Sequence, residues 1–577
     1  MFSLHYKKNN NTSLFQSLDK IGMTKIQNYV PLYGLFFSLN DDNYNSINLN
    51  HHYSVTSVEN HDDKNKFVCK LSSDNNSAKR LSFFKFSPLL DPVKYLIGKY
   101  KDISSNQLTT LPSLTMDNIH PKLADINNSA YVDSFFSYLT SQLLHKHKFL
   151  HGLDFYGSFL SIKSKFATNV IDDLEYLHDS DYFRENKTDL FELVNWSEDM
   201  GFDFDTRHNK KRIKIGGGGI EDEIKDDVVP VSSLDFDGIF TDNAETGEKV
   251  DESKGMDTSN NLVFQYDIEQ QQHRSTKASS TCSSRSSNTD SDEKKSQAGD
   301  EDDASSSDKS SEASTGSMNS DVELKVAIKD FPVQVICLEC LDNTLDSRLR
   351  EENEMDDDEW RSCLFQIVMM LIAYQKAFGF THNDLHTNNI MFNETDRTFI
   401  NYRFNNQFFK VPTFGRIYKI IDFGRAIYKF RGKTICSDSF HSKGDAATQY
   451  NCEPYFNEKK ARLDPNTSFD LCRLACSLFD YFIDDLDEQH KVKDPIAAVI
   501  VEWCKDDKGR NVLYKKNGDE RYPDFKLYKM IARTVTKHKP EQQVGRRLFR
   551  KFLSSRKKIG KKAKVIDIDA LNSYVDE

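Results

Sequence analysis

The sequence contains no long hydrophobic run. Its most apolar stretch, from Leu364 to Tyr374, is too short to cross a bilayer as a helix. The first residues, MFSLHYKK, lack the apolar core of a signal peptide. These absences predict a soluble intracellular protein of the cytoplasm or nucleus, without a membrane partner.

Patterned cysteines are also missing. The ten cysteines follow no short repeating spacing, which is typical of reduced thiols in an intracellular protein. Cys337 and Cys340 form a C-x-x-C, and Cys472 and Cys476 lie one helical turn apart. Each pair lies in a strongly apolar stretch, where small buried thiols are common. We therefore expect packing thiols, with a shared zinc site as the less favoured alternative.

Net positive charge is absent, because the formal charge of the chain is −12 at pH 7. Global charge therefore gives no support to general nucleic-acid binding. Lys and Arg are nevertheless concentrated in residues 546–564. We assign residues 546–577 to a basic C-terminal tail. It either binds nucleic acid through 546–564 or is a solvated helical tail.

A long central segment has little that could form a core. Residues 278–320 contain no aromatic residue and no Val, Ile or Leu, and more than a third of them are Ser. Such a composition cannot bury enough apolar surface to offset the entropy of the chain. We therefore predict an acidic, Ser-rich disordered insertion over residues 201–325.

The remaining sequence shows patterns of folded structure. Runs of β-branched and aromatic residues predict strands, and apolar residues at three- and four-residue spacing predict helices. The expected strands are 53–58, 66–71, 80–86, 150–162, 333–339 and 417–421, with a hairpin of 399–404 and 407–411. The expected helices are 131–147 and 358–378, and residues 465–555 are expected to be helical with loops.

Two short motifs carry residues suited to chemistry. Residues 381–391 read THNDLHTNNIM, and residues 420–424 read IIDFG. The first matches H-x-D-L-x-x-x-N and the second matches D-F-G, so this part of the chain resembles the protein-kinase superfamily. The resemblance implies that Asp384 is the catalytic base and that Asn389 and Asp422 hold Mg²⁺. Amide and carboxylate oxygens are suitable hard ligands for magnesium beside ATP phosphates.

The same resemblance assigns looser matches to nucleotide binding. Lys85 in Phe-Phe-Lys-Phe resembles the lysine that grips the ATP phosphates, although such a lysine is otherwise a snorkelling surface residue. Leu338, Glu339 and Cys340 resemble the hinge, whose backbone would bond adenine. His386 stands where serine/threonine kinases usually carry Lys, and we include it among the ATP-binding residues.

Two further residues are expected to support the catalytic loop. His382 opens the first motif. Asp470 resembles the residue at a helix start that props up this loop. Asp470 equally fits an acid at a helix N-terminus, favoured by the helix dipole.

The chain departs from the kinase pattern in three places. The turn from Glu59 to Asn65, before Lys85, contains no Gly, so the backbone would approach phosphates poorly there. No Glu follows in the next helix to pair with Lys85; Asp133 and Gln142 are the nearest substitutes, and neither is a clear match. Asn383 replaces the Arg that usually docks a phosphorylated activation loop, which predicts activity without such phosphorylation.

With these departures and its many Asn residues, the chain is most similar to serine/threonine-protein kinases of giant DNA viruses. The resemblance implies an α+β, two-lobed fold with a small β-rich N-lobe and a mainly helical C-lobe. The expected parts are an N-terminal extension (1–45), the first part of the N-lobe (46–200), a hinge strand and hinge (326–342), and the C-lobe (343–545). The expected activity is transfer of the ATP γ-phosphate to Ser or Thr of a protein substrate. A pseudokinase scaffold and a small-molecule kinase are the alternatives.

Overall fold

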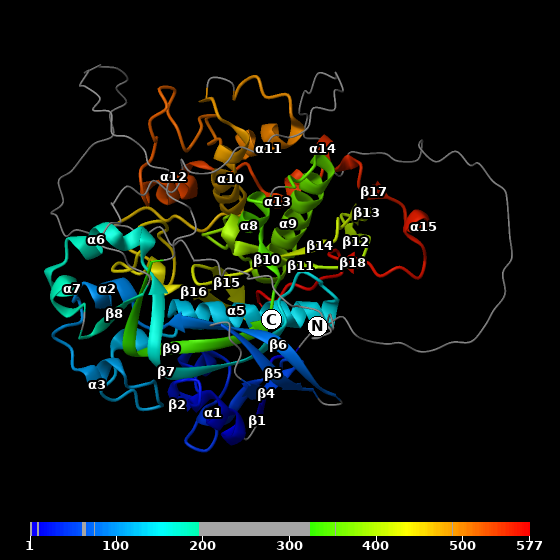
Figure 1. Ribbon diagram of the computed structural model, residues 1–577. Helices are drawn as coiled ribbons and strands as arrows, with labels where there is room; N and C mark the ends of the chain where they lie inside the picture. The colour runs from blue at the N-terminus through cyan, green and yellow to red at the C-terminus, as the bar shows by residue number, and fades with distance from the viewer. Residues whose placement is uncertain are drawn as a thin grey trace, which may run out of the picture.

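The computed structural model describes residues 3–8, 11–59, 65–73, 76–187, 189–194, 324–351, 353–486 and 489–576. The chain has a mixed α/β architecture with a β-rich N-terminal region. Figure 1 shows this region below helix α5 (Ser129–His147) and most of the later helices above it. The predicted insertion lies outside the described residues, except that its last positions, Leu324 and Lys325, belong to the folded part.

A seven-stranded antiparallel sheet dominates the N-terminal region. Its order is β2 (Met23–Gln27), β7 (Phe155–Asn169), β9 (Lys325–Glu339), β6 (Ser77–Pro88), β5 (Lys66–Ser72) and β4 (Ser54–Glu59), and β8 (Phe191–Val194) pairs with the start of β9. The strands predicted from 53 to 86, from 150 and from 333 are confirmed, and several are longer than expected. Val194 pairs with Lys325, so the chain leaves and re-enters the sheet at neighbouring positions.

The other sheets have two to four strands each. A two-stranded sheet joins β1 (Tyr6–Lys8) to β3 (Ile47–Leu49). A three-stranded sheet has the order β10 (Asn343–Thr344), β11 (Ile390–Glu394) and β14 (Arg416–Ile420), and β15 (Ile427–Phe430) pairs with β16 (Lys433–Cys436). The predicted hairpin is confirmed as β12 (Phe399–Phe404) and β13 (Gln407–Pro412).

The first part of the chain also contains several shorter helices. They are α1 (Thr12–Asp19), α2 (Pro92–Leu96), α3 (Ser105–Leu108), α4 (Pro121–Ala124), α6 (Leu174–His178) and α7 (Asp181–Asn186). The later helices are α8 (Leu345–Leu349), α9 (Asp357–Phe378), α10 (Phe469–Phe482), α11 (Pro495–Trp503), α12 (Lys526–Thr534), α13 (Pro540–Gln543), α14 (Arg547–Arg550) and α15 (Arg556–Ile559). Among the described residues, none of these helices is long and apolar enough to cross a membrane.

Both predicted long helices are confirmed and have clear end signals. The side chain of Asp356 accepts a hydrogen bond from Glu359 N at the start of α9, and the helix ends at Gly379, whose φ of 56° is left-handed. Asn128 caps α5 in the same way. These end contacts satisfy backbone groups that a helix leaves unpaired. Both helices are almost fully buried, and the hydrophobic side chains of the described chain form one continuous core.

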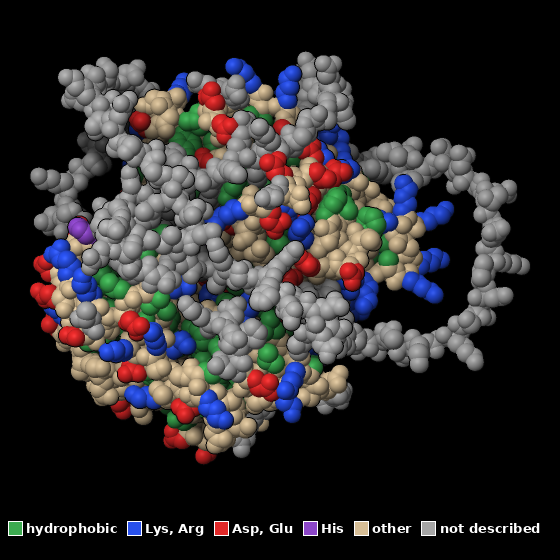
Figure 2. Space-filling view, in the orientation of Figure 1, with side chains coloured by type: hydrophobic (Ala, Val, Ile, Leu, Met, Phe, Trp, Pro, Cys, Tyr) green, Lys and Arg blue, Asp and Glu red, His purple; other side chains and the backbone are tan. Residues whose placement is uncertain are grey.

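The end of the chain differs from the solvated tail that its composition allowed. Two-residue strands β17 (Leu553–Ser554) and β18 (Ile566–Asp567) extend the β12–β13 hairpin on both sides. Apolar residues of this tail, such as Phe549 and Ile568, are buried and fix this path. The turn around α15 is an exposed basic surface, where Figure 2 shows basic side chains pointing outward. Nucleic-acid binding through this surface stays a prediction.

Candidate active site

The two motifs meet because two strands run side by side. The first motif forms the loop before β11, and Asp422 follows β14. Ile390 of β11 pairs with Ile420 of β14, and Ile421 N donates to Asn389 O at 3.0 Å. This register brings Asn389 and Asp422 to the same end of the pair. Asp422 has a φ of 63°, so its backbone turns sharply there.

Asp470 holds the loop of the first motif through two backbone amides. Its Oδ2 accepts from His382 N and its Oδ1 accepts from Asn383 N, each at 2.9 Å. It is fully buried in the first turn of α10. One carboxylate therefore satisfies two loop amides and benefits from the helix N-terminus at the same time. Asp470 therefore both supports the loop and is an acid at a helix N-terminus, so the two interpretations are compatible.

His382 joins the two motifs through its ring. Nδ1 lies 3.2 Å from Asp384 N, which donates to it, and Nε2 lies 2.9 Å from Ile421 O. Because the backbone amide can only donate, Nδ1 must accept and the proton is on Nε2. The neutral ring thus connects the residue before Asp422 to the amide of Asp384.

Asn383 links the loop to the segment after D-F-G. Its Nδ2 donates to Arg425 O at 2.9 Å, and its Oδ1 accepts from Tyr450 OH at 2.8 Å. Its φ of 65° is left-handed, a conformation that Asn tolerates better than most residues. Asn383 thus holds the segment after D-F-G by neutral hydrogen bonds, at the position where the kinase pattern has an Arg.

Lys85 forms a three-part charge cluster. Its Nζ lies 2.7 Å from Asp133 Oδ2 and 2.9 Å from Asp422 Oδ1. Asp133 Oδ1 also accepts from Phe423 N at 2.9 Å. The cluster therefore joins strand β6, helix α5 and the D-F-G motif. Gln142, the other substitute considered, donates to Asn50 O instead.

The cluster is charged despite its burial. Burial works against the ammonium of Lys85, but the two carboxylates outweigh it and raise its pKa. Burial likewise acts to raise the pKa of Asp422, but Lys85 outweighs it and the net shift is downward. For Asp133 burial prevails, and its pKa is raised. At neutral pH Lys85 is thus a cation facing an ionised Asp422.

Asp384 is nearly buried, with 8% of its surface exposed. Tyr528 OH donates to its Oδ1 at 2.8 Å, and Arg425 Nη1 lies 3.6 Å from its Oδ2. Burial acts to raise the pKa of Asp384, but the positive charges of Arg425 and Arg473 and the Tyr528 hydrogen bond lower it below its ordinary value. Asp384 is therefore ionised at neutral pH and able to accept a hydroxyl proton.

Asn389 presents one oxygen without a partner. Its Nδ2 donates to Asp384 O at 2.9 Å and lies 3.1 Å from His386 Nε2. Burial lowers the pKa of His386 to about 4, so the neutral ring can accept this bond. Asn389 Oδ1 is buried and has no hydrogen-bond partner in the described part of the chain. Since buried polar atoms are normally satisfied, this oxygen suits a metal ligand.

The donor set fits a magnesium ion better than a protein-enclosed metal. Among the described residues there is no group of three or more His, Cys, Asp and Glu that could hold a metal. Asn389 and Asp422 would supply only two protein ligands. Mg²⁺ commonly takes one or two carboxylates and completes its shell with water and substrate phosphates.

Two of the three expected hinge residues already take part in contacts within the protein. Leu338 still lies inside the sheet, paired with Phe83 and Phe155. Glu339 N donates to Asp154 O at 2.9 Å, so this amide is not a donor for a base. The Glu339 carboxylate binds the buried ammonium of Lys419. The Glu339 side chain thus has a structural contact, and Cys340, half-buried, is the first residue beyond the strand. The assignment of Leu338, Glu339 and Cys340 to a hinge stays a prediction.

Comparison with protein-family models and with curated proteins finds no match. A functional assignment therefore depends on the two motifs and on the geometry that surrounds them.

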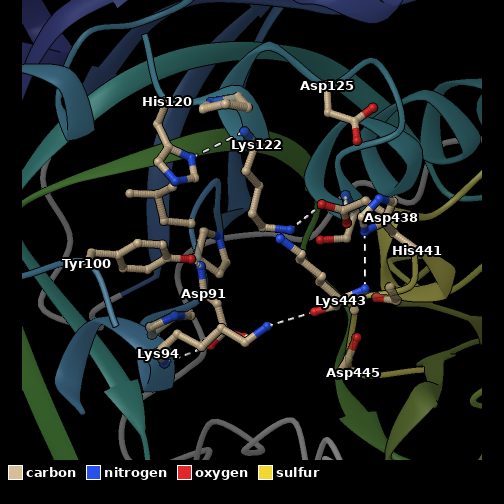
Figure 3. A pocket seen from close by; sticks show the side chains of 17 residues that line it. Asp91, Lys94, Tyr100, His120, Lys122, Asp125, Asp438, His441, Lys443 and Asp445 are labelled. Atoms are coloured by element: carbon tan, nitrogen blue, oxygen red, sulfur yellow. Dashed lines mark hydrogen bonds and ion pairs between the residues drawn. The ribbon is translucent and has the colours of Figure 1, made fainter. Parts of the chain in front are cut away.

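Sequence reasoning missed Asp438, which anchors the segment after D-F-G to α5. Its carboxylate forms an ion pair with Lys122, and its Oδ1 accepts from Ser129 N, the first residue of α5, at 3.0 Å. Both groups line a cavity of about 540 Å³ between α2, α4 and this segment. Figure 3 shows Lys122 and Asp438 pointing toward one another there. Nothing local in the sequence marks Asp438, because its partners lie some 300 residues earlier.

Proposed function

We propose that the protein is an ATP-dependent protein kinase that transfers the γ-phosphate to Ser or Thr hydroxyls. The observation that carries the proposal is the cluster of Lys85, Asp133 and Asp422, beside an Asn389 oxygen that has no hydrogen-bond partner among the described residues. A lysine held by a helix carboxylate next to the D-F-G aspartate resembles the arrangement that protein kinases use for phosphoryl transfer from ATP.

Each residue then has a defined task. Asn389 and Asp422 would hold Mg²⁺, and Lys85 would hold ATP phosphates. The metal neutralises the negative charge of the phosphates when it is bound. Asp384 orients the acceptor hydroxyl and takes its proton on a carboxylate oxygen. Because its pKa is lowered, orientation contributes more than basicity.

The proposal includes a two-lobed kinase fold. The large sheet with α5 would form the N-lobe, and the region from α8 onward the C-lobe, with Leu338–Cys340 as the connection. In support, the sheet places Lys85 opposite Ile336 of the connecting strand β9. The segment between Val194 and Leu324 would be an insertion at the edge of the N-lobe.

A pseudokinase is the second candidate. It is favoured by the absence of Gly between Glu59 and Asn65, of which residues 60–64 lie outside the described structure. It is also favoured by the Glu339 amide, which is already bonded to Asp154 O. Both features weaken the expected contacts to a nucleotide, whereas Asp384, Asn389 and Asp422 are unaffected.

Transfer of labelled phosphate from Mg-ATP separates these candidates. Wild type, Asp384→Asn and Asp422→Asn are compared on generic protein substrates and on the chain itself, with Asp519→Asn as an exposed control. Transfer by wild type and by the control, lost in both site variants, supports the kinase. Absence of transfer together with absence of an ATP-induced thermal shift supports the pseudokinase. ATP binding without transfer to protein would direct the search to small-molecule acceptors.

A further inference from the structure

Asp384 has two carboxylate oxygens in unequal surroundings. Oδ1 accepts the hydrogen bond from Tyr528 OH at 2.8 Å. Oδ2 accepts no hydrogen bond from the described residues, and its nearest cation, Arg425 Nη1, is 3.6 Å away. One oxygen is therefore held, and the other retains its lone pairs for an incoming hydroxyl.

Tyr528 is itself fixed from three sides. Arg473 Nε donates to its hydroxyl oxygen at 2.9 Å, so the Tyr528 proton must point toward Asp384. Its ring stacks on Phe525 with centroids 5.2 Å apart, and it packs against Phe469 of α10. Only 2% of Tyr528 is exposed. A side chain held in one position by these contacts is suited to orient the carboxylate of Asp384.

We propose that Tyr528 is a positioning residue of the phosphotransferase site, which with Arg473 fixes Asp384 through Oδ1 so that Oδ2 faces the acceptor hydroxyl. This inference rests on the proposed function for its catalytic meaning. The contact itself is independent of it, because the two hydrogen bonds from Arg473 to Tyr528 and from Tyr528 to Asp384 exist whatever the substrate.

Tyr528→Phe removes only the hydroxyl and leaves the ring packed on Phe525. Without its bond the Asp384 carboxylate can rotate away from the acceptor, and hydrogen bonds to charged groups correspond to roughly tenfold or more in rate. We expect kcat to fall at least about tenfold, with the KM for ATP unchanged. The hydrogen bonds and ring contacts of Tyr528 described above involve none of Lys85, Asn389 and Asp422.

Tyr514→Phe is the matched control. Tyr514 OH donates to Asp480 Oδ1 at 2.9 Å in the same helical region, so this variant loses the same type of bond away from Asp384. It should keep the wild-type kcat. Equal kinetic losses in both variants would show a purely structural effect and overturn the proposal.

A second measurement does not need turnover. With [ζ-¹³C]tyrosine labelling, the Tyr528 signal, assigned by its loss in Tyr528→Phe, should shift when Asp384 becomes Asn. The stability losses of Tyr528→Phe and Asp384→Asn should also be non-additive. Additive losses and an unmoved signal would overturn the contact. If wild type transfers no phosphate but these couplings are found, the kinase assignment fails while the Tyr528–Asp384 contact stands.

Discussion

Asp133→Asn is the most direct perturbation of the charge cluster. Asn has nearly the same shape as Asp and keeps an oxygen that can accept from Phe423 N, so the substitution removes the charge and the acceptor atom that faces Lys85. Asp133 is 2% exposed, so water cannot replace the lost partner on the helix side. The Lys85 ammonium keeps its contact with Asp422 at 2.9 Å.

The loss of stability in Asp133→Asn should be moderate, because Lys85 keeps its contact with Asp422. Removing one partner of a fully buried ion pair costs about 3–5 kcal/mol. Here the Lys85 side chain is 24% exposed and retains Asp422. We therefore expect a loss of about 1–3 kcal/mol in the free energy of unfolding. Lys85 should also move toward Asp422, and a displacement of about 1 Å can lower the rate roughly 100-fold.

Urea unfolding and steady-state transfer from labelled ATP measure the two effects. Gln142→Ala is a control on the same helix, because Gln142 is buried and contacts Asn50 instead of Lys85. It should lose stability yet keep the kcat/KM for ATP at a temperature where it is folded. An Asp133→Asn protein with wild-type stability and wild-type kcat/KM would refute the role of the cluster.

Two other predictions concern different parts of the fold. Asp438→Asn should lower activity about tenfold in protein that carries no phosphate on residues 425–455, because the charge-assisted contact to Lys122 anchors the segment after D-F-G. Mass spectrometry and transfer assays check this, and activity that depends on a phosphosite in that range would contradict it. His151, whose Nδ1 lies 2.7 Å from Tyr418 O, has a pKa lowered by burial to about 4. Because the unfolded chain protonates first as pH falls, His151 should remove up to about 3 kcal/mol of stability between pH 6.5 and 4. His151→Gln should flatten the pH dependence of the urea midpoint in that range, whereas the same change at exposed His178 should not.

The sequence predicted which residues of the candidate site lie close together where neighbouring residues define them. Asp384 and Asn389 share one loop, and Asp422 follows the adjacent strand, so a local motif is sufficient to place them. Long periodic helices and alternating strands were predicted for the same reason. The two-residue strands β17 and β18 have no such pattern, and their pairing depends on the β12–β13 hairpin, more than 140 residues earlier.

Contacts between distant segments could not be predicted where no motif marks both partners. Asp133 pairs with Lys85 across 48 positions, and Tyr528 reaches Asp384 across 144. Whether an acid on α5 faces Lys85 depends on the rotation and height of the helix against the sheet, which tertiary packing decides. Asp133 and Gln142 were therefore equivalent in the sequence, although only Asp133 faces the lysine.

The short side chain of Asp133 requires α5 to lie close to Lys85. An Asp side chain is one carbon–carbon bond shorter than Glu, about 1.5 Å, so its helix must lie closer to Lys85 to form the same ion pair. The fold holds α5 at both ends. Asp438 binds its first amide, and His147 in its last turn lies 2.6 Å, Nε2 to OH, from Tyr574 near the end of the chain. Since the Tyr574 amide also donates to Ala377 O of α9, the segment after D-F-G and the C-terminal residues together hold the helix where a short carboxylate can reach the lysine.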